Sequence, residues 1–222
     1  MTGPLSTRSA HALTRPGIQL TTGFLSLWIL ATGFLAAAHA GNKNPYPAPV
    51  APLITLVQNG SARAAIVAPK KPSPIERRAV QELVDYVTKI TGTELPVVDD
   101  PKTTGLPILI GAPARQALPD VRWEDLGDDG FILKSDAQGI RIAGAKDLGT
   151  LFGVYHFLEK HLGVRWFMPG ELGQVIPRKK TLQVGTFEET EVPSFRIRWV
   201  ENGDWALRQK MNVSVKVDDR PV

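Results

Sequence analysis

The chain has 222 residues, of which 43% are hydrophobic and 22% are charged, and its formal net charge is +4. This composition is typical of one folded domain with extensions, and it excludes a wholly disordered chain and a membrane protein with many spans. No cysteine is present, which excludes disulfide bonds, thiolate zinc sites and a cysteine nucleophile. A complete (β/α)₈ barrel of about 250 residues does not fit.

The first forty residues have the pattern of a secretory signal peptide. Arg8 and Arg15 precede an apolar segment, residues 24–38, and residues 38–40 (Ala-His-Ala) are small enough for a signal peptidase. We expect cleavage after Ala40 and a periplasmic or extracellular protein. The alternative is an uncleaved anchor, because about 20 apolar residues can span a bilayer. Membrane contact is expected only through this segment.

The positive charge is not concentrated in the rest of the chain. Arg8 and Arg15 account for two of the four net charges, and the longest basic run, residues 178–180, contains no aromatic residue on which a base could stack. We therefore expect no nucleic-acid partner.

A proline-rich linker, residues 41–52, is expected to be extended. Residues 53–57 and 63–68 then predict the two strands of a hairpin, because Asn59-Gly60 between them is a strong turn signal.

The clearest helix signal begins at Ser73. Ser73 and Glu76 match a capping box, and Pro74 occupies the first helical position, where its missing N–H costs nothing. Apolar residues recur on one face as far as Ile90, and Gly92 is the expected left-handed terminator. The sequence therefore predicts an amphipathic helix over residues 73–91.

The remaining chain predicts a domain rich in strands, with a second long helix over residues 147–161. Short apolar runs bounded by turn residues predict further strands at residues 96–98, 107–110, 131–134, 139–143, 164–167, 181–184 and 195–200, followed by part of a helix at 205–212. Because hairpins are mixed with crossovers, we expect an α+β fold: a two-layer sandwich with a mixed β-sheet and helices packed mainly on one face.

Three patterns suggest chemistry, but each is incomplete. Residues 144–150 resemble a phosphate loop, but Thr150 stands where lysine is needed, so a tight turn is predicted. His156 and His161 point about 140° apart on a helix, so we expect no metal site. Adjacent acids such as Glu188-Glu189 are expected to be solvated turn residues. We predict no cofactor.

Glu159 points toward the apolar face of the second predicted helix, and a buried carboxylate needs a partner. We expect a structural ion pair between Glu159 and either Arg165 or Arg196. The alternative is a catalytic role for Glu159 or Glu171 as a general acid.

Several segments, taken in order, resemble a known family. They are residues 79–96 (AVQELVDYVTKITGTELP), 108–111 (ILIG), 129–131 (DGF), 162–167 (LGVRWF) and 193–198 (PSFRIR). They resemble the N-terminal domain that precedes the catalytic barrel in alpha-glucuronidase-like (glycoside hydrolase family 67) and beta-hexosaminidase-like enzymes, closest to secreted bacterial members. The resemblance implies that residues 53–193 form a non-catalytic α/β domain and that residues 194–222 begin a truncated catalytic barrel.

The resemblance also implies where a substrate would lie. Active sites form at the carboxyl ends of barrel strands, so Trp199, Glu201, Asn202 and Asp204 become substrate-binding candidates for a carbohydrate. No catalytic residue can be carried over, because a glycoside hydrolase needs two carboxyl groups on a rigid frame. We expect the chain to be inactive alone, with the missing barrel supplied in the same chain or by a partner.

A second hypothesis is a free-standing carbohydrate-binding or interaction module. In that case Trp123, Trp166 and Trp199 would stack on sugar rings; otherwise these tryptophans belong to the core or contact a barrel.

Overall fold

The computed structural model describes residues 52–212, except residues 104 and 201–202. The chain divides into two units, residues 1–49 and 50–222. The predicted signal peptide, its cleavage site after Ala40 and almost all of the linker lie outside the described residues. Within the described part, none of the helices is both long and apolar enough to span a membrane.

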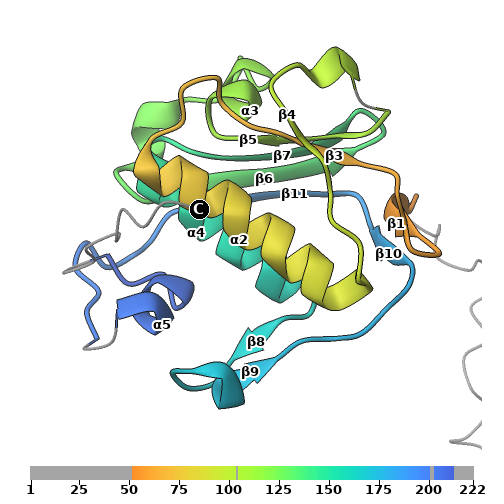
Figure 1. The fold of residues 1–222 in the computed structure, drawn as a ribbon. Coiled ribbons are helices and arrows are strands. Elements are labelled where there is room, and N and C mark those ends of the chain that lie inside the picture. Colours follow the sequence, from red (N-terminus) through yellow and green to blue (C-terminus); the bar gives the residue numbers. More distant parts are fainter. Residues whose placement is uncertain (1–51, 104, 201–202, 213–222) are drawn as a thin grey trace, which may run out of the picture. The chain divides into compact units, whose positions relative to one another are not determined.

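The centre of the described domain is a mixed sheet of six strands in the order β11-β6-β7-β5-β3-β4 (Figure 1). Its strands are β3 (Ala65–Val67), β4 (Val97–Val98), β5 (Pro107–Ile110), β6 (Phe131–Asp136), β7 (Gly139–Gly144) and β11 (Phe187–Glu191). β4, β3, β5 and β7 are mutually parallel, whereas β6 pairs antiparallel with β7 and with β11. The mixed sheet and the predicted β6–β7 hairpin are confirmed.

Two long helices, α2 (Pro74–Thr91) and α4 (Asp147–Lys160), cover one face of this sheet, and the short helix α3 (Ala112–Gln116) lies on the other (Figure 1). The alternation of side chains along each strand explains the two layers. Ile66 and Ile108 belong to the core with the long helices, whereas their neighbours Val67 and Leu109 pack with Ala114 of α3. The α+β sandwich with helices mainly on one face is confirmed.

Helix α2 begins and ends as its sequence predicts. The Ser73 hydroxyl accepts a hydrogen bond from the Glu76 amide at 3.1 Å, and the Glu76 carboxylate accepts one from the Ser73 amide at 3.2 Å. Gly92 ends the helix with φ of 76°, in the left-handed region. The capping box and the terminator use only neighbouring residues, so they form whatever the tertiary contacts are.

The first predicted hairpin is only half right. β1 (Ile54–Gln58) turns at Asn59 and Gly60, whose φ angles are 48° and 77°, into β2 (Ser61–Ala62). The expected second strand, residues 63–68, does not pair with β1, because Ala65–Val67 enters the central sheet as β3. All three β3 residues are buried, which suits a parallel strand covered on both faces better than a hairpin edge.

Two other predicted strands form, but not in the central sheet. β8 (Arg165–Trp166) pairs with β9 (Gln174–Val175), and β10 (Leu182–Val184) pairs with β1. The edge of β6 that they could have joined is occupied by β11, which the sequence did not predict as a strand. The described part also contains three short 3₁₀ helices. They are η2 (Pro101–Thr103) between β4 and β5, η3 (Trp123–Leu126) between α3 and β6, and η4 (Glu171–Gly173) between β8 and β9.

The strand expected at residues 195–200 is not formed. These residues run in an irregular path and lead to a short helix, α5 (Gly203–Arg208), which begins and ends earlier than predicted. A strand needs a neighbour for its main-chain hydrogen bonds, and no strand of the described part pairs with residues 195–200.

The turn at residues 144–150 is a close contact between helix and sheet. The Gly144 amide donates to the Thr150 hydroxyl at 3.0 Å. A Cβ atom added to Gly149 would lie 2.3 Å from the Gly130 carbonyl oxygen, closer than real Cβ atoms come. The lack of a side chain at Gly149 therefore lets α4 lie directly on the main chain.

We expect Gly149→Ala to lower the free energy of unfolding by about 1 to 3 kcal/mol, because the new methyl group would push against main-chain atoms that cannot rotate away. This change should appear although alanine favours a helix by about 1 kcal/mol. Urea denaturation followed by circular dichroism measures it. The control is Gly185→Ala, whose Cβ would have no atom within 4 Å; equal stability of the two variants would contradict the close contact.

Candidate functional site

Residues 195–212, here called the anchored segment, are fastened to the sandwich at Asp129. The buried Asp129 carboxylate forms an ion pair with Arg198 and accepts a hydrogen bond from the Asn212 side chain at 2.8 Å. Arg198 also donates through Nε to the Lys210 carbonyl at 2.9 Å. Asp129 lies in the DGF motif and Arg198 in the PSFRIR motif, so two motifs that are distant in sequence contact each other in the structure.

A second attachment uses the main chain of β8. The Trp205 indole and the Gln209 amide both donate to the Trp166 carbonyl, at 3.1 Å and 2.8 Å. Trp166 itself is buried, donates to the Tyr86 hydroxyl at 2.7 Å, and meets the rings of Tyr86 and Tyr155 edge to face. Helix α5 is thus docked against the core through aromatic residues that have both apolar surface and a polar atom.

Charged groups complete this attachment. Glu82 on α2 lies between two guanidinium groups, 3.3 Å from Arg78 and 3.4 Å from Arg208. Burial raises the pKa of the Tyr155 phenol beside them well above its usual value, so this hydroxyl stays protonated at neutral pH. The cluster joins α2 to α5.

The substrate-binding candidates differ in their exposure and contacts. Trp199 is 58% exposed, whereas the Asp204 carboxylate accepts a hydrogen bond from Arg78 at 2.9 Å. Glu201 and Asn202 lie outside the described residues. The structure therefore places Trp199 on the surface and directs Asp204 toward α2.

The partner predicted for Glu159 was wrong. Its carboxylate pairs with Lys210 at 3.0 Å and its side chain is 37% exposed. The Arg165 guanidinium donates instead to the main-chain carbonyl of Glu159, near the carboxyl end of α4, where cations are favoured. Arg196 is exposed and forms no ion pair with Glu159 within the described part. Lys210 is brought in by the fold of the anchored segment, which sequence spacing does not reveal.

The tryptophans are not equivalent either. Trp166 is buried in the main core and Trp123 packs beside Val67 and Leu126. Trp166 is therefore inaccessible to a sugar ring in this conformation, whereas Trp123 is half-buried. Of the three tryptophans considered for stacking, Trp199 alone is mostly exposed.

An exposed apolar strip lies on the anchored segment. Phe195, Ile197 and Trp199 are 74%, 72% and 58% exposed, while Arg198 turns inward to Asp129. These three side chains lie within five residues of one another along the irregular segment. Exposed apolar side chains grouped in this way mark a surface for another chain or domain.

Glu189 was expected in a solvated turn, but it lies on β11 and faces α4. Its carboxylate is 3.1 Å from His156 Nε2, 3.4 Å from His161 Nε2 and 3.0 Å from Lys160 Nζ. The His161 ring also stacks on Phe187 with 3.8 Å between centroids. Recognising residues 187–191 as a strand would have located this cluster from the sequence. The pattern Phe187-Glu188-Glu189 is too polar to indicate a strand.

These groups do not form a metal site. Within the described ranges, no set of three histidine, aspartate or glutamate side chains is placed to hold a metal ion. Burial lowers the pKa of His161 from its ordinary value of 6.5, although Glu189 acts in the opposite direction. Partial burial raises the pKa of Glu189, but Lys160 and the two histidines outweigh this effect and hold it below 4.5. The cluster joins α4 to β11 through the Glu189 carboxylate.

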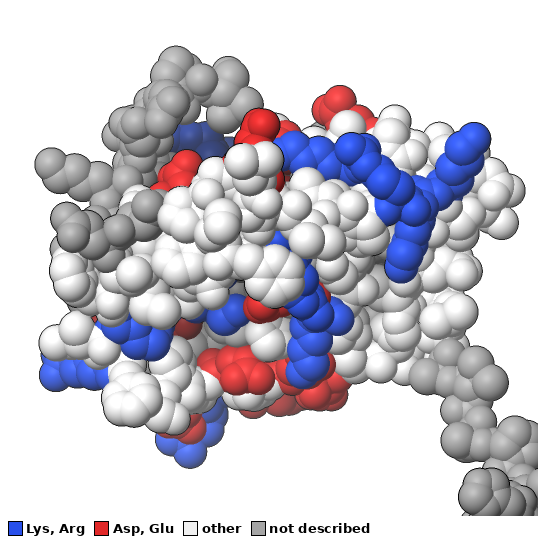
Figure 2. All heavy atoms as spheres, turned by 90° about the horizontal axis from the view of Figure 1, so that it is seen from below, with Lys and Arg blue, Asp and Glu red and all other residues white. Residues whose placement is uncertain are grey.

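Charges of both signs lie side by side on the face shown in Figure 2, without one continuous basic field. Such a distribution suits local ion pairs. The absence of a nucleic-acid partner stays a prediction.

Residues 54–157 match the family model "Glycosyl hydrolase family 67 N-terminus". This match confirms the resemblance inferred from the motifs: the segment is of the type that forms the N-terminal domain of such glycoside hydrolases. Comparison of the sequence with curated proteins gives no match.

Two solved structures are similar to this chain, and the first of them has the same fold. A family GH115 4-O-methyl-alpha-glucuronidase with specificity for decorated arabinogalactans has a TM-score of 0.52 and 22% identity, over 66% of this chain and 19% of that one. The GH20 beta-N-acetylhexosaminidase from Streptomyces coelicolor A3(2) has a TM-score of 0.44 and 22% identity, over 69% of this chain and 27% of that one. The chain therefore spans well under half of the length of either enzyme.

We expect Asp129→Ala to lower the free energy of unfolding by about 3 kcal/mol, because Arg198 would keep its partly buried charge without a partner. Urea denaturation measures this change, and a cycle with Arg198→Ala should show that the two substitutions are not additive. The matched control is Asp128→Ala. Asp128 pairs with Lys146 on the surface, so no measurable loss is expected. Equal losses for the two aspartates would contradict the anchoring role.

We expect stability to fall as the pH is lowered from about 8 to about 5. The folded protein binds a proton at His161 less readily than the unfolded chain does, so the contribution is present above the unfolded pKa of 6.5 and is lost below it. The lowered pKa of Glu189 causes a further loss below 4.5. Urea denaturation at several pH values measures both. His161→Phe, which keeps a ring beside Phe187, should flatten the upper part of the profile; an unchanged slope would contradict this origin.

Proposed function

We propose that this chain is the non-catalytic N-terminal accessory domain of an exported glycoside-hydrolase-like protein, whose catalytic barrel hydrolyses O-glycosyl bonds. The match of residues 54–157 supports the type of domain. The pattern of the first forty residues supports export. The barrel is supplied in the same chain or by a partner chain.

The exposed apolar strip carries this proposal. Phe195, Ile197 and Trp199 are directed outward from a segment that Asp129 and Trp166 fasten to the sandwich. The strip is thus exposed but held in place, which lowers the entropy lost when another surface docks on it. A barrel domain in contact with the strip would cover side chains that are otherwise left in water.

The state of the carboxylates supports a non-catalytic role. Glycoside hydrolysis needs one carboxyl group as an acid and a second across the scissile bond, about 5 to 10 Å apart. Glu82 lies between two arginines, Asp129 is paired with Arg198, and Glu159 is paired with Lys210. These three acids are engaged in ion pairs that hold elements of the fold together.

A second candidate function is a free-standing module that binds carbohydrate through the anchored segment. The exposed indole of Trp199 favours it, because an accessible aromatic face can pack on the C–H face of a sugar ring. Asp204 would lie nearby in sequence, with Glu201 and Asn202 between them. Sugar binding that is lost in Trp199→Ala would support this module.

We expect the purified 222-residue chain to release no chromophore from a panel of aryl glycosides, because Glu82, Asp129 and Glu159 are engaged in ion pairs within the sandwich. A spectrophotometric assay measures release, with the same panel and a known glycosidase as the positive control. Turnover that disappears in Glu159→Gln or Glu171→Gln would contradict the accessory role and assign chemistry to these residues.

Reading the gene beyond the codon for Val222 separates the two candidates. A barrel that continues in frame or after a frameshift supports the accessory domain. A stop codon at this position in many separate sources favours the module.

A further inference from the structure

The central sheet has a point where neighbouring parallel strands are continued on opposite faces. After β3 the chain passes to α2 on one face, and after β5 it passes to α3 on the other. β3 and β5 are adjacent and parallel. In open α/β sheets, ligands bind in the crevice that such a change of direction leaves at the carboxyl ends of the strands.

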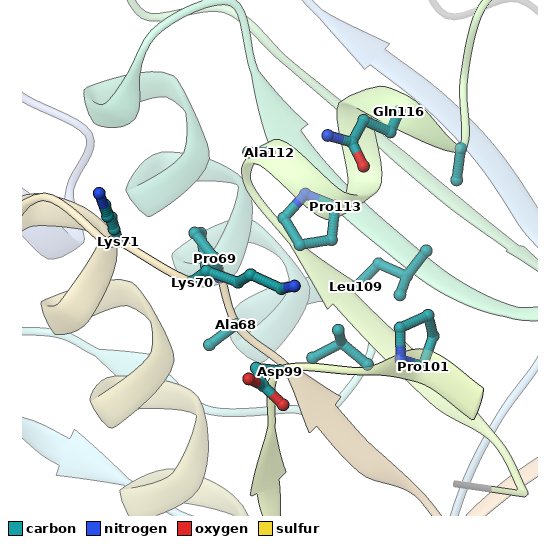
Figure 3. A pocket seen from close by; sticks show the side chains of 12 residues that line it. Ala68, Pro69, Lys70, Lys71, Asp99, Pro101, Leu109, Ala112, Pro113 and Gln116 are labelled. Carbon is teal, nitrogen blue, oxygen red and sulfur yellow. The ribbon is translucent and has the colours of Figure 1, made fainter. Parts of the chain in front are cut away.

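A groove of about 660 Å³ occupies this place, within the size range of sites for small molecules. Its walls come from the ends of β3, β4 and β5 and from α3 (Figure 3). They are mainly apolar and short: Val67, Leu109, Pro69, Pro101 and Pro113.

Four polar side chains line the same groove: Lys70, Lys71, Asp99 and Gln116. Figure 3 shows the Lys70 ammonium extended across it, the Asp99 carboxylate at one side and the Gln116 amide turned inward from α3. Lys71 is directed away from the centre. Neither Lys70 nor Asp99 has an ion pair or side-chain hydrogen bond with another residue of the described part. The groove thus presents an unused cation and an unused acceptor, separated by apolar surface.

The walls are held in place from behind. Glu76 in the first turn of α2 is buried, and its Oε1 lies 3.5 Å from the Arg115 guanidinium of α3. Arg115 also donates to the Gly144 carbonyl at 3.0 Å. A Cβ at Gly111, the residue between β5 and α3, would lie 2.4 Å from Glu76 Oε1. These contacts fix α3 relative to α2, so the groove is formed before any ligand arrives.

We propose that this groove binds a monomeric sugar acid, a small molecule with one carboxylate and several hydroxyl groups. The carboxylate pairs with Lys70, the hydroxyl groups donate to Asp99 and exchange hydrogen bonds with Gln116, and the C–H surface packs on the prolines and Leu109. A simple carboxylate leaves Asp99 without a donor, and a neutral sugar leaves the Lys70 charge without a counterion. Each loses one of the two polar partners. This inference does not depend on the accessory role proposed above.

The test titrates the 222-residue chain with D-galacturonate, D-galactose and acetate, using calorimetry for affinity and amide NMR shifts for location. We expect D-galacturonate to bind at least about tenfold more tightly than either other probe, which is about 1.4 kcal/mol. The shifted amides should be those around Lys70, Asp99 and Gly111. No binding of D-galacturonate, equal binding of acetate, or shifts elsewhere would overturn the proposal.

Two variants and a matched control test the assigned contacts. Lys70→Met should weaken D-galacturonate binding at least about tenfold while leaving D-galactose unaffected. Asp99→Ala should reduce the preference for D-galacturonate over acetate, because the hydroxyl acceptor is lost. The control is Lys71→Met, which removes an adjacent charge directed away from the groove, and its effect should be several-fold smaller. Equal effects of the two lysine variants would overturn the role of Lys70.

Discussion

The close contact of α4 with the main chain at Asp129 and Gly130 positions the groups that attach the anchored segment to the sandwich. Gly149 has no Cβ, so the helix lies against the Gly130 carbonyl and fixes the backbone beside the buried Asp129. Asp129 then pairs with Arg198 and fastens the anchored segment. The same helix carries His156, which faces Glu189 of β11. A missing side chain at one position thus determines where two charged attachments can form.

The main role of the partly buried charged groups in this domain is to form ion pairs that hold its elements together. Several ion pairs are partly buried, where they are screened less than on the surface, and those of Asp129, Glu159 and Glu189 join elements that are distant in sequence. Removing one partner would leave the other charge poorly solvated, which is costly. At Glu189 the neighbouring Lys160 and histidines lower the pKa of the carboxyl group, which favours its charged form. A scaffold built this way can present a surface precisely while performing no chemistry with these acids.

The two surfaces inferred to bind differ in physical character. The apolar strip of Phe195, Ile197 and Trp199 is exposed, which suits contact with another folded surface. The groove at β3 and β5 is concave and holds opposite charges that have no partners within the described residues, which suits a small polar ligand. A domain with both features could combine support of a companion domain with recognition of a small molecule.

The sequence alone determined the features that depend on neighbouring residues. The capping box of Ser73 and Glu76, the terminator Gly92 and the turn at Asn59 all form through contacts a few residues apart, and the hydrophobic pattern correctly gave both long helices. The tertiary structure decided which strands pair and which charges meet. Glu159 meets Lys210, 51 residues away, and the polar strand β11 is recognised only by its pairing with β6. Spacing along the chain gives directions within one element, but contacts between elements depend on how those elements pack.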